Sequence, residues 1–281
     1  MPYAVDLTTL TDLKNYISPT LAATTASDAI LAKTITAVSA GINRYCSRTL
    51  ALSTVSEVRN GNGRDSIRTL IYPILSVTSL VIAPLFGSPG QTILPPTAGS
   101  TAVPQFSHDN WFIYLNGGFR ECGFCAGRQN ITLNYTAGFI TPGQLQVLAL
   151  PTWVASTNVS QNQQVQVGGF YYTAINAGTT GTGSTWLTTR NSITVDNGVN
   201  WLCNGPIPVL PPNADIINAD FQQACMQQSA LLFKNRTRVG DTGSGVGPDR
   251  INYFLKGAHP STLDLVNPHR EVFPTDGMGI V

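Results

Sequence analysis

The segment from Ser27 to Arg48 has the longest unbroken helical periodicity in this sequence. Its apolar residues recur every three or four positions, so a helix places them on one stripe. The members of this stripe are Leu31, Ile35, Val38, Ile42 and Tyr45. A single helix cannot bury such a stripe alone, because most helical stability in proteins comes from packing of the apolar face. We therefore expect a bundle whose other helices come from elsewhere in the chain or from another subunit.

Two other segments have the pattern of partner helices. Residues 9 to 17 predict a short helix, which Thr9 can cap and Ser18-Pro19 ends. Residues 213 to 236 predict a longer helix with Asn213 as its cap. Its apolar face contains Ile217, Phe221, Ala224, Leu231 or Leu232, and Phe233. The bundle can therefore be completed within one chain.

From Leu50 onward the apolar period changes to two, which is typical of strands. Strands at 53–59 and 66–71 flank Asn60-Gly61-Asn62-Gly63 and predict a hairpin. A kink and a strand follow at 72–82, and residues 83–110 read as a loop. Two more strands are expected at 111–115 and 130–135. The fold class is therefore α+β, a small helical bundle with an antiparallel sheet.

The composition changes after Thr141. Residues 151–205 contain almost no charge and three of the four tryptophans. Strands are expected at 164–168, 170–175 and 193–195, with turns at 168–169 and 178–181. Because the last bundle helix lies beyond it, this segment is predicted to be an inserted β module.

The sequence thus predicts three parts. Residues 1–150 and 206–239 form a helical domain with a β-sheet, residues 151–205 form the inserted module, and residues 240–281 form an extended C-terminal tail. The tail has little periodicity and is expected to be extended unless something binds it.

The surface must be covered mainly by uncharged polar residues, because only 11% of residues are charged. Such surfaces are common in subunits packed against neighbours, although a weakly charged monomer is also possible. With a net charge of +1 there is no global field to attract nucleic acid or an anionic membrane. No long apolar run or secretion signal is present, so we expect no membrane association. Five scattered cysteines argue against a disulfide framework and suit a reducing cytosol.

Few residues indicate chemistry. Cys122-Gly123-Phe124-Cys125 has the spacing of half a zinc site, but no second pair follows. A mixed site with His108 or Cys203 is conceivable, yet two neutral thiols in a loop are favoured, and no metal or cofactor is expected. The histidines lie in loop-like sequence, and Gly243-Ser244-Gly245 matches a nucleophile elbow only in part. We expect no enzymatic activity.

Several short strings, taken in order, resemble the head-to-tail connector, or adaptor, proteins of tailed bacteriophages. They cover about two thirds of the chain. The strings are residues 10–16 (LTDLKNY), 42–48 (INRYCSR), 72–77 (YPILSV), 130–139 (NITLNYTAGF), 210–212 (LPP) and 234–236 (KNR).

This resemblance implies a small helical bundle with a β hairpin or sheet and a structural role without catalysis. It implies a homo-oligomeric ring, typically a dodecamer, that lies under the portal protein in the neck of the virion. Such a ring contacts a downstream tail or neck protein and continues the channel for genomic DNA, without sequence-specific binding. Assembly would take place in the host cytoplasm. The inserted module departs from the pattern of most relatives.

The resemblance also suggests contact residues. Lys234, Arg236 and Arg238 can complement a helix dipole, and a portal-binding or channel-lining role is the alternative. In the tail, further partner contacts are expected at Arg250, Tyr253, Phe254 and Phe273. The side of the 27–48 helix opposite the apolar stripe is expected to meet the neighbouring subunit through Lys33, Thr36 and Asn43.

The aromatic residues of the inserted module allow two interpretations. A module of this size needs its tryptophans in its core, and this interpretation is favoured. The alternative is a carbohydrate-binding tail or fibre component, because the strand pair at 165–172 faintly resembles small tryptophan-bearing carbohydrate-binding modules. The glycan contacts would then be Trp153, Tyr172, Trp186 and Trp201.

Overall fold

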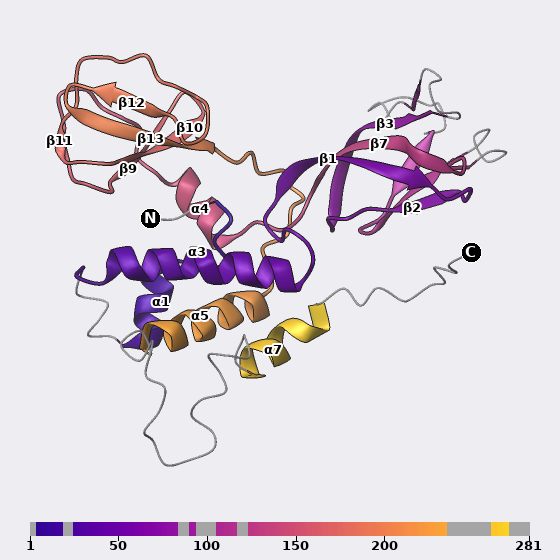
Figure 1. The fold of residues 1–281 in the computed structure, drawn as a ribbon, viewed down its shortest axis with the longest axis horizontal. Coiled ribbons are helices and arrows are strands. Elements are labelled where there is room, and N and C mark those ends of the chain that lie inside the picture. Colours follow the sequence, from indigo (N-terminus) through magenta and orange to yellow (C-terminus); the bar gives the residue numbers. More distant parts are fainter. Residues whose placement is uncertain are drawn as a thin grey trace, which may run out of the picture. The chain divides into compact units, whose positions relative to one another are not determined.

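The computed structural model describes residues 4–18, 25–83, 90–93, 105–116, 123–234 and 260–269. The fold is of the mixed α+β class with antiparallel sheets, as predicted (Figure 1). The chain divides into two compact units. Unit 1 contains residues 1–47, 141–209 and 217–281, and unit 2 contains residues 48–140 and 210–216. The helices and the inserted module thus fall in one unit and the first sheet falls in the other. The three-part division of the sequence stays a prediction.

The first two helices form where their capping and periodicity predict them. Helix α1 spans Leu10–Ile17, and the Thr9 hydroxyl accepts a hydrogen bond from the Asp12 N–H at 3.0 Å. Helix α3 spans Asp28–Tyr45 and buries Leu31, Ile35, Val38 and Ile42. The apolar stripe of the sequence is therefore the buried face of the longest helix.

The partner helix α5 spans Ala219–Lys234, so the predicted start at Asn213 is wrong. Residues 210–216 belong to unit 2, where Asn213 lies in a turn and the Asp215 carbonyl accepts the Ile140 N–H at 2.8 Å. Asn218 takes the role expected of Asn213, since its side chain accepts the Asp220 N–H at 3.0 Å.

Two short helices were not predicted. Helix α4 spans Pro142–Leu148 and begins with a capping box between Thr141 and Gln144. Helix α7 spans Pro260–Val266 and is followed by a 3₁₀ turn, Asn267–His269. This part of the segment expected to be extended is helical, because Thr262 and Val266 lie on one face of α7 and are buried.

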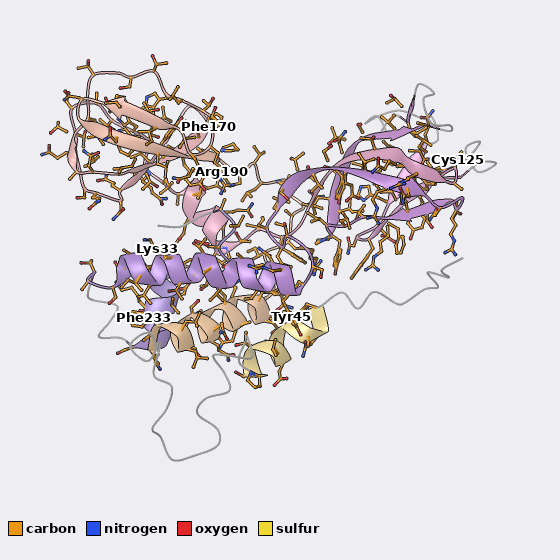
Figure 2. All side chains as sticks on the ribbon, in the orientation of Figure 1. Lys33, Tyr45, Cys125, Phe170, Arg190 and Phe233 are labelled. Atoms are coloured by element: carbon orange, nitrogen blue, oxygen red, sulfur yellow. The ribbon has the colours of Figure 1, made fainter. Side chains whose placement is uncertain are left out.

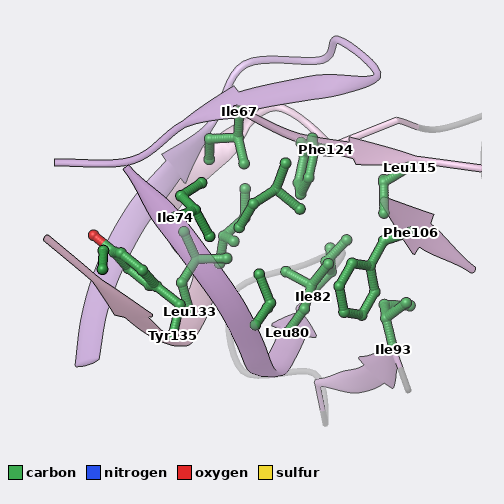
Figure 3. Close-up of a cluster of buried hydrophobic side chains, with 14 residues drawn as sticks. Ile67, Ile74, Leu80, Ile82, Ile93, Phe106, Leu115, Phe124, Leu133 and Tyr135 are labelled. Carbon is green, nitrogen blue, oxygen red and sulfur yellow. The ribbon is translucent and has the colours of Figure 1, made fainter. Parts of the chain in front are cut away.

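Unit 2 contains a four-stranded antiparallel sheet in the order β1-β7-β3-β4 and a three-stranded one in the order β2-β6-β5. The strands are β1 (Ser53–Gly61), β2 (Ser66–Arg68), β3 (Ile74–Ile82), β4 (Gln91–Ile93), β5 (Phe106–His108), β6 (Phe112–Leu115) and β7 (Gly127–Ala137). Both sheets contribute to one apolar core, which includes Leu80, Phe106, Phe124, Leu133 and Tyr135 (Figure 3).

The predicted hairpin around Asn60-Gly61-Asn62-Gly63 is wrong in its pairing. Strand β1 pairs with β7, whereas β2 pairs with β6. The turn between them instead bonds to residues 123–125, because Phe124 enters the core and its N–H donates to the Arg64 carbonyl at 2.6 Å. A Cβ atom on Gly61 would lie 1.8 Å from the Cys125 carbonyl oxygen, so only glycine fits there. The predicted loop at 83–110 also contains strands β4 and β5.

The inserted module has an antiparallel sheet in the order β12-β13-β10-β9 and a two-stranded pair, β11-β8. Its strands are β8 (Asn158–Val159), β9 (Gln164–Val167), β10 (Phe170–Ala174), β11 (Gly178–Thr179), β12 (Ile193–Asp196) and β13 (Val199–Pro206). The predicted turn at Gly168-Gly169 is confirmed, since both residues have positive φ and β9 pairs with β10. Strand β13 was not predicted.

Candidate assembly surfaces

The buried side of α3 is tied to its partners by polar contacts as well as by its apolar stripe. The Lys14 ammonium of α1 lies 2.9 Å from the Asp28 carboxylate at the start of α3. The Ser39 hydroxyl accepts the Leu7 N–H at 3.0 Å and lies 3.5 Å from the Cys225 sulfur of α5. Burial raises the pKa of the Cys225 thiol to about 12, so the thiol stays protonated at neutral pH. This face is therefore internal and chemically inert.

The other side of α3 is open to solvent (Figure 2). Its exposed residues are Ala29, Ile30, Lys33, Ala37, Ala40, Gly41 and Arg44. Of the predicted subunit contacts, Lys33 is exposed, whereas Thr36 and Asn43 are half-buried. The Thr36 hydroxyl bonds back to the Ala32 carbonyl at 3.2 Å. Their role in an interface stays a prediction.

Helices α3 and α7 both pack on α5 (Figure 1). An apolar groove lies among the three helices. Its volume is about 320 Å³. Helix α3 contributes Ala37, Val38, Gly41, Ile42 and Tyr45, α5 contributes Gln228 and Leu232, and α7 contributes Thr262, Leu263 and Val266. Among the described residues, no charged side chain lines this groove, which we call the α7 groove.

Side-chain hydrogen bonds hold α7 beside this groove. The Tyr45 hydroxyl donates to the Asn267 side chain, and the Ser261 hydroxyl lies 3.3 Å from the Gln227 amide oxygen. The His269 ring nitrogen Nε2 lies 3.0 Å from the Asp220 carboxylate, and its ring lies 4.7 Å from that of Phe221. The walls of the α7 groove are therefore fixed at both ends of α7.

A second apolar feature of unit 1 is a ridge on α4. Leu145 is 43% exposed and Leu148 is 37% exposed, and they lie three residues apart on one side of the helix. Hydrogen bonds to the N-terminal segment anchor the helix, from the Gly143 N–H to the Asp6 carbonyl at 3.1 Å and from the Thr141 hydroxyl to the Ala4 carbonyl at 2.9 Å. Sequence reasoning missed this ridge, although Thr141-Pro142 with Gln144 is a helix-start pattern.

In unit 2, aromatic and arginine side chains form a column. The Arg48 guanidinium lies 3.5 Å from the centre of the Tyr72 ring, which stacks on Trp111 at 4.0 Å. The guanidinium of Arg68 lies 5.4 Å from the Trp111 ring. Trp111 is 42% exposed, but Tyr72 and Arg68 lie against its ring. The column stabilises the turn before β6 by cation–π and stacking contacts.

One of the predicted partner contacts lies within the described residues. Lys234 is the last residue of α5 and is exposed. Arg236, Arg238, Arg250, Tyr253, Phe254 and Phe273 lie outside the described residues.

The predicted glycan contacts are wrong for two of the four residues. Tyr172 and Trp201 are fully buried, because they form the core of the inserted module with Val165, Val199 and Cys203. Neither ring can stack on a sugar. Trp153 and Trp186 are half-buried and pack against this core, with 5.7 Å between their ring centres in an edge-to-face arrangement.

A buried carboxylate organises the same module. Asp196 is 1% exposed and accepts three hydrogen bonds, from the Trp153 indole N–H at 3.0 Å, the Gly181 N–H at 2.8 Å and the Ser184 hydroxyl at 3.0 Å. The indole of Trp153 is therefore committed to a structural contact, and nothing in this geometry favours glycan binding.

The segment from Cys122 to Cys125, which has the spacing of half a zinc site, contributes to the core of unit 2. Cys122 lies outside the described residues, and Cys125 is half-buried. Between them, Phe124 is fully buried in the core of unit 2. Among the residues that the structure describes, no group of three or more His, Cys, Asp or Glu side chains is arranged to hold a metal ion. In the same part of the chain, no helix is long and apolar enough to cross a membrane.

Comparison with known proteins gives little further information. No family model matches the chain, and no curated protein matches it. Among solved structures, it is similar to one described as "Neck of empty GTA particle computed with C6 symmetry". The two share 13% sequence identity and a TM-score of 0.41, over 96% of this chain and 93% of that chain.

Proposed function

We propose that this chain is a structural virion protein, the head-to-tail adaptor of a tailed bacteriophage or related particle. It forms a ring below the portal protein, joins the portal to the tail and continues the channel for DNA. The protein acts in the neck of the virion, is assembled in the host cytoplasm and catalyses no reaction.

This proposal is supported by the position in the fold of the short sequence segments that resemble adaptor proteins. Residues 10–16 fall in α1, residues 42–48 include the end of α3, and residues 130–139 contain most of β7. The string at 72–77 leads into β3, and residues 210–212 precede α5. Four of these strings therefore lie in the bundle or the sheet that the resemblance implies, whereas residues 210–212 lie in unit 2, outside both.

A ring also needs surfaces that favour subunit packing over solvation. Unit 1 exposes small and apolar residues on α3 and α4 and has an uncharged groove beside α7. Surfaces of this composition lose little hydration when they are buried against a neighbour. We assign Lys33, Thr36 and Asn43 to the rim of this subunit contact.

The portal and the downstream tail protein are assigned to the C-terminal part of the chain. Lys234 marks the point where α5 ends, and the basic and aromatic residues from Arg236 to Phe273 follow it. Residues 1–150 with 206–239 would then be the ring-forming domain, residues 151–205 a module displayed by it, and residues 240–281 the docking tail.

The test is assembly with a portal protein. The full chain is mixed with the portal protein of the same particle, and native mass spectrometry and electron microscopy measure the complex. We expect a ring of this chain on the portal, and a variant with Arg250→Ala, Tyr253→Ala and Phe254→Ala, which keeps α7, is expected to lose portal binding. A chain that stays monomeric with its portal, and whose tail is dispensable, would contradict the proposal.

A further inference from the structure

We propose that the α4 ridge of one copy docks into the α7 groove of the next copy. The ridge is Leu145 and Leu148, and the groove is the apolar space among α3, α5 and α7. This inference rests on the proposed function, because it names the contact by which the ring would form.

The two surfaces match in chemistry. Helix α4 has the sequence PGQLQVL and carries no charge, and no charged residue lines the groove. Two leucines three residues apart are the pattern by which a helix fills an apolar groove. Docking would therefore bury apolar surface on both sides without stripping water from any ion.

The wall of the groove on α3 is low enough for a helix to approach. A Cβ atom added at Gly41 would meet nothing within 4 Å, and Ala37 precedes it by one turn. Small residues four apart let another backbone come close. The glycine reduces the intrinsic stability of α3, and close approach of a neighbour explains why it stands there.

The ridge and the groove lie on different sides of α3, which favours head-to-tail association. Ala37 and Gly41 face the groove, whereas Ser39 faces the N-terminal segment, through its bond to Leu7. The α4 helix is anchored to the same segment, by Asp6. Because consecutive residues of a helix are about 100° apart, Ala37 and Ser39 point in nearly opposite directions. A contact between two different surfaces of the same chain closes into a ring when the rotation allows it.

The experiment uses two complementary variants of the full chain. Leu145→Ser with Leu148→Ser removes the ridge, and Gly41→Leu fills the groove. Leu187→Ser is the matched control, since Leu187 is 46% exposed on the inserted module and belongs to neither surface. Circular dichroism and thermal unfolding confirm that each variant is folded, and sedimentation velocity and native mass spectrometry measure its assembly.

We expect each variant to self-associate about tenfold or more weakly than the wild type, while the control assembles normally. An equimolar mixture of the two variants retains one intact ridge and one intact groove, so it should form a dimer and stop there. Rings from the mixture, or normal assembly of either variant alone, would overturn the docking contact. If the wild type neither self-associates nor joins the portal, the proposed function fails as well, which is a distinct result.

Discussion

At the scale of single residues, Asp196 joins three separate parts of the inserted module. Its carboxylate accepts from an indole, a backbone amide and a hydroxyl, and it is almost completely buried. We expect Asp196→Ala to reduce the free energy of unfolding of the module by about 3 kcal/mol, because three partly buried donors lose their acceptor. Urea unfolding followed by tryptophan fluorescence measures this, since three tryptophans lie in the module.

The control for that substitution is a neighbour on the same strand. Val195 is 66% exposed, so Val195→Thr should change the stability by less than about 0.5 kcal/mol. An equal loss in both variants would mean that Asp196 has no special role and that β12 is sensitive to any change.

Asp109 gives a pH-dependent prediction for unit 2. Desolvation raises its pKa, but hydrogen bonds from the Trp111 and Phe112 N–H groups and the Tyr114 hydroxyl outweigh it, so the pKa of Asp109 is lowered. A lowered folded-state pKa means that the stabilisation is present above the unfolded value, about 3.9, and is lost as the pH falls through the folded value. The stability of Asp109→Asn should therefore depend less on pH than that of the wild type below about pH 4. Acid titration followed by circular dichroism compares the two, and parallel curves would contradict this assignment.

At the scale of elements, the start of α4 depends on its capping box. The Thr141 hydroxyl accepts the Gln144 N–H at 3.2 Å, and the Gln144 side chain accepts the Thr141 N–H at 3.1 Å. We expect Thr141→Ala to destabilise the chain by about 1 kcal/mol and Thr141→Ser to be nearly neutral, because serine keeps the capping oxygen. Denaturant unfolding of the two variants measures the difference. If serine is as harmful as alanine, packing of the Thr141 methyl group is the larger effect.

The elements that sequence predicts best are those with strong local signals. The pair Thr9 and Asp12 predicted the start of α1, and the regular apolar stripe from Leu31 to Tyr45 predicted α3. The predictions were wrong where contacts between residues far apart in the sequence determine the secondary structure. The segment from Asn60 to Gly63 has the sequence of a hairpin turn, but β1 pairs with the longer strand β7. These two strands are far apart in the sequence, since the Gln129 N–H donates to the side chain of Asn60, 69 residues before it. Helix α7 has only seven residues, too few for a clear period, and it forms because α5 offers a surface.

The candidate surfaces were less predictable than the elements. The exposed side of α3 follows from the position of its apolar stripe. The groove does not, because its walls come from helices at 28–45, 219–234 and 260–266. Tryptophan spacing likewise left two interpretations of the inserted module open. The burial of Trp201 and Tyr172 decides between them for these two residues.

At the scale of the whole molecule, a low charge content shapes how copies would associate. If assembly uses the uncharged ridge and groove, it should be nearly independent of salt between about 0.05 and 1 M NaCl, because no ion pair is there to be screened. It should weaken on cooling, because apolar burial is less favourable at low temperature and has a negative heat capacity change. Sedimentation at several salt concentrations and temperatures tests this. Dissociation at high salt would point instead to charged contacts such as Lys33 and Arg44.

The partner that buries the α3 stripe is separated from it by most of the chain. Helix α3 ends at Tyr45 and α5 begins at Ala219, so 173 residues are synthesised between them. At about 5–20 residues per second, the ribosome needs roughly 10–35 s to deliver α5. During this interval Leu31, Ile35, Val38 and Ile42 have no α5 to cover them, whereas the sheet of unit 2 can already form. The nascent chain is thus a substrate for chaperones that bind apolar helices, and a message truncated before codon 219 would yield a protein that aggregates through α3.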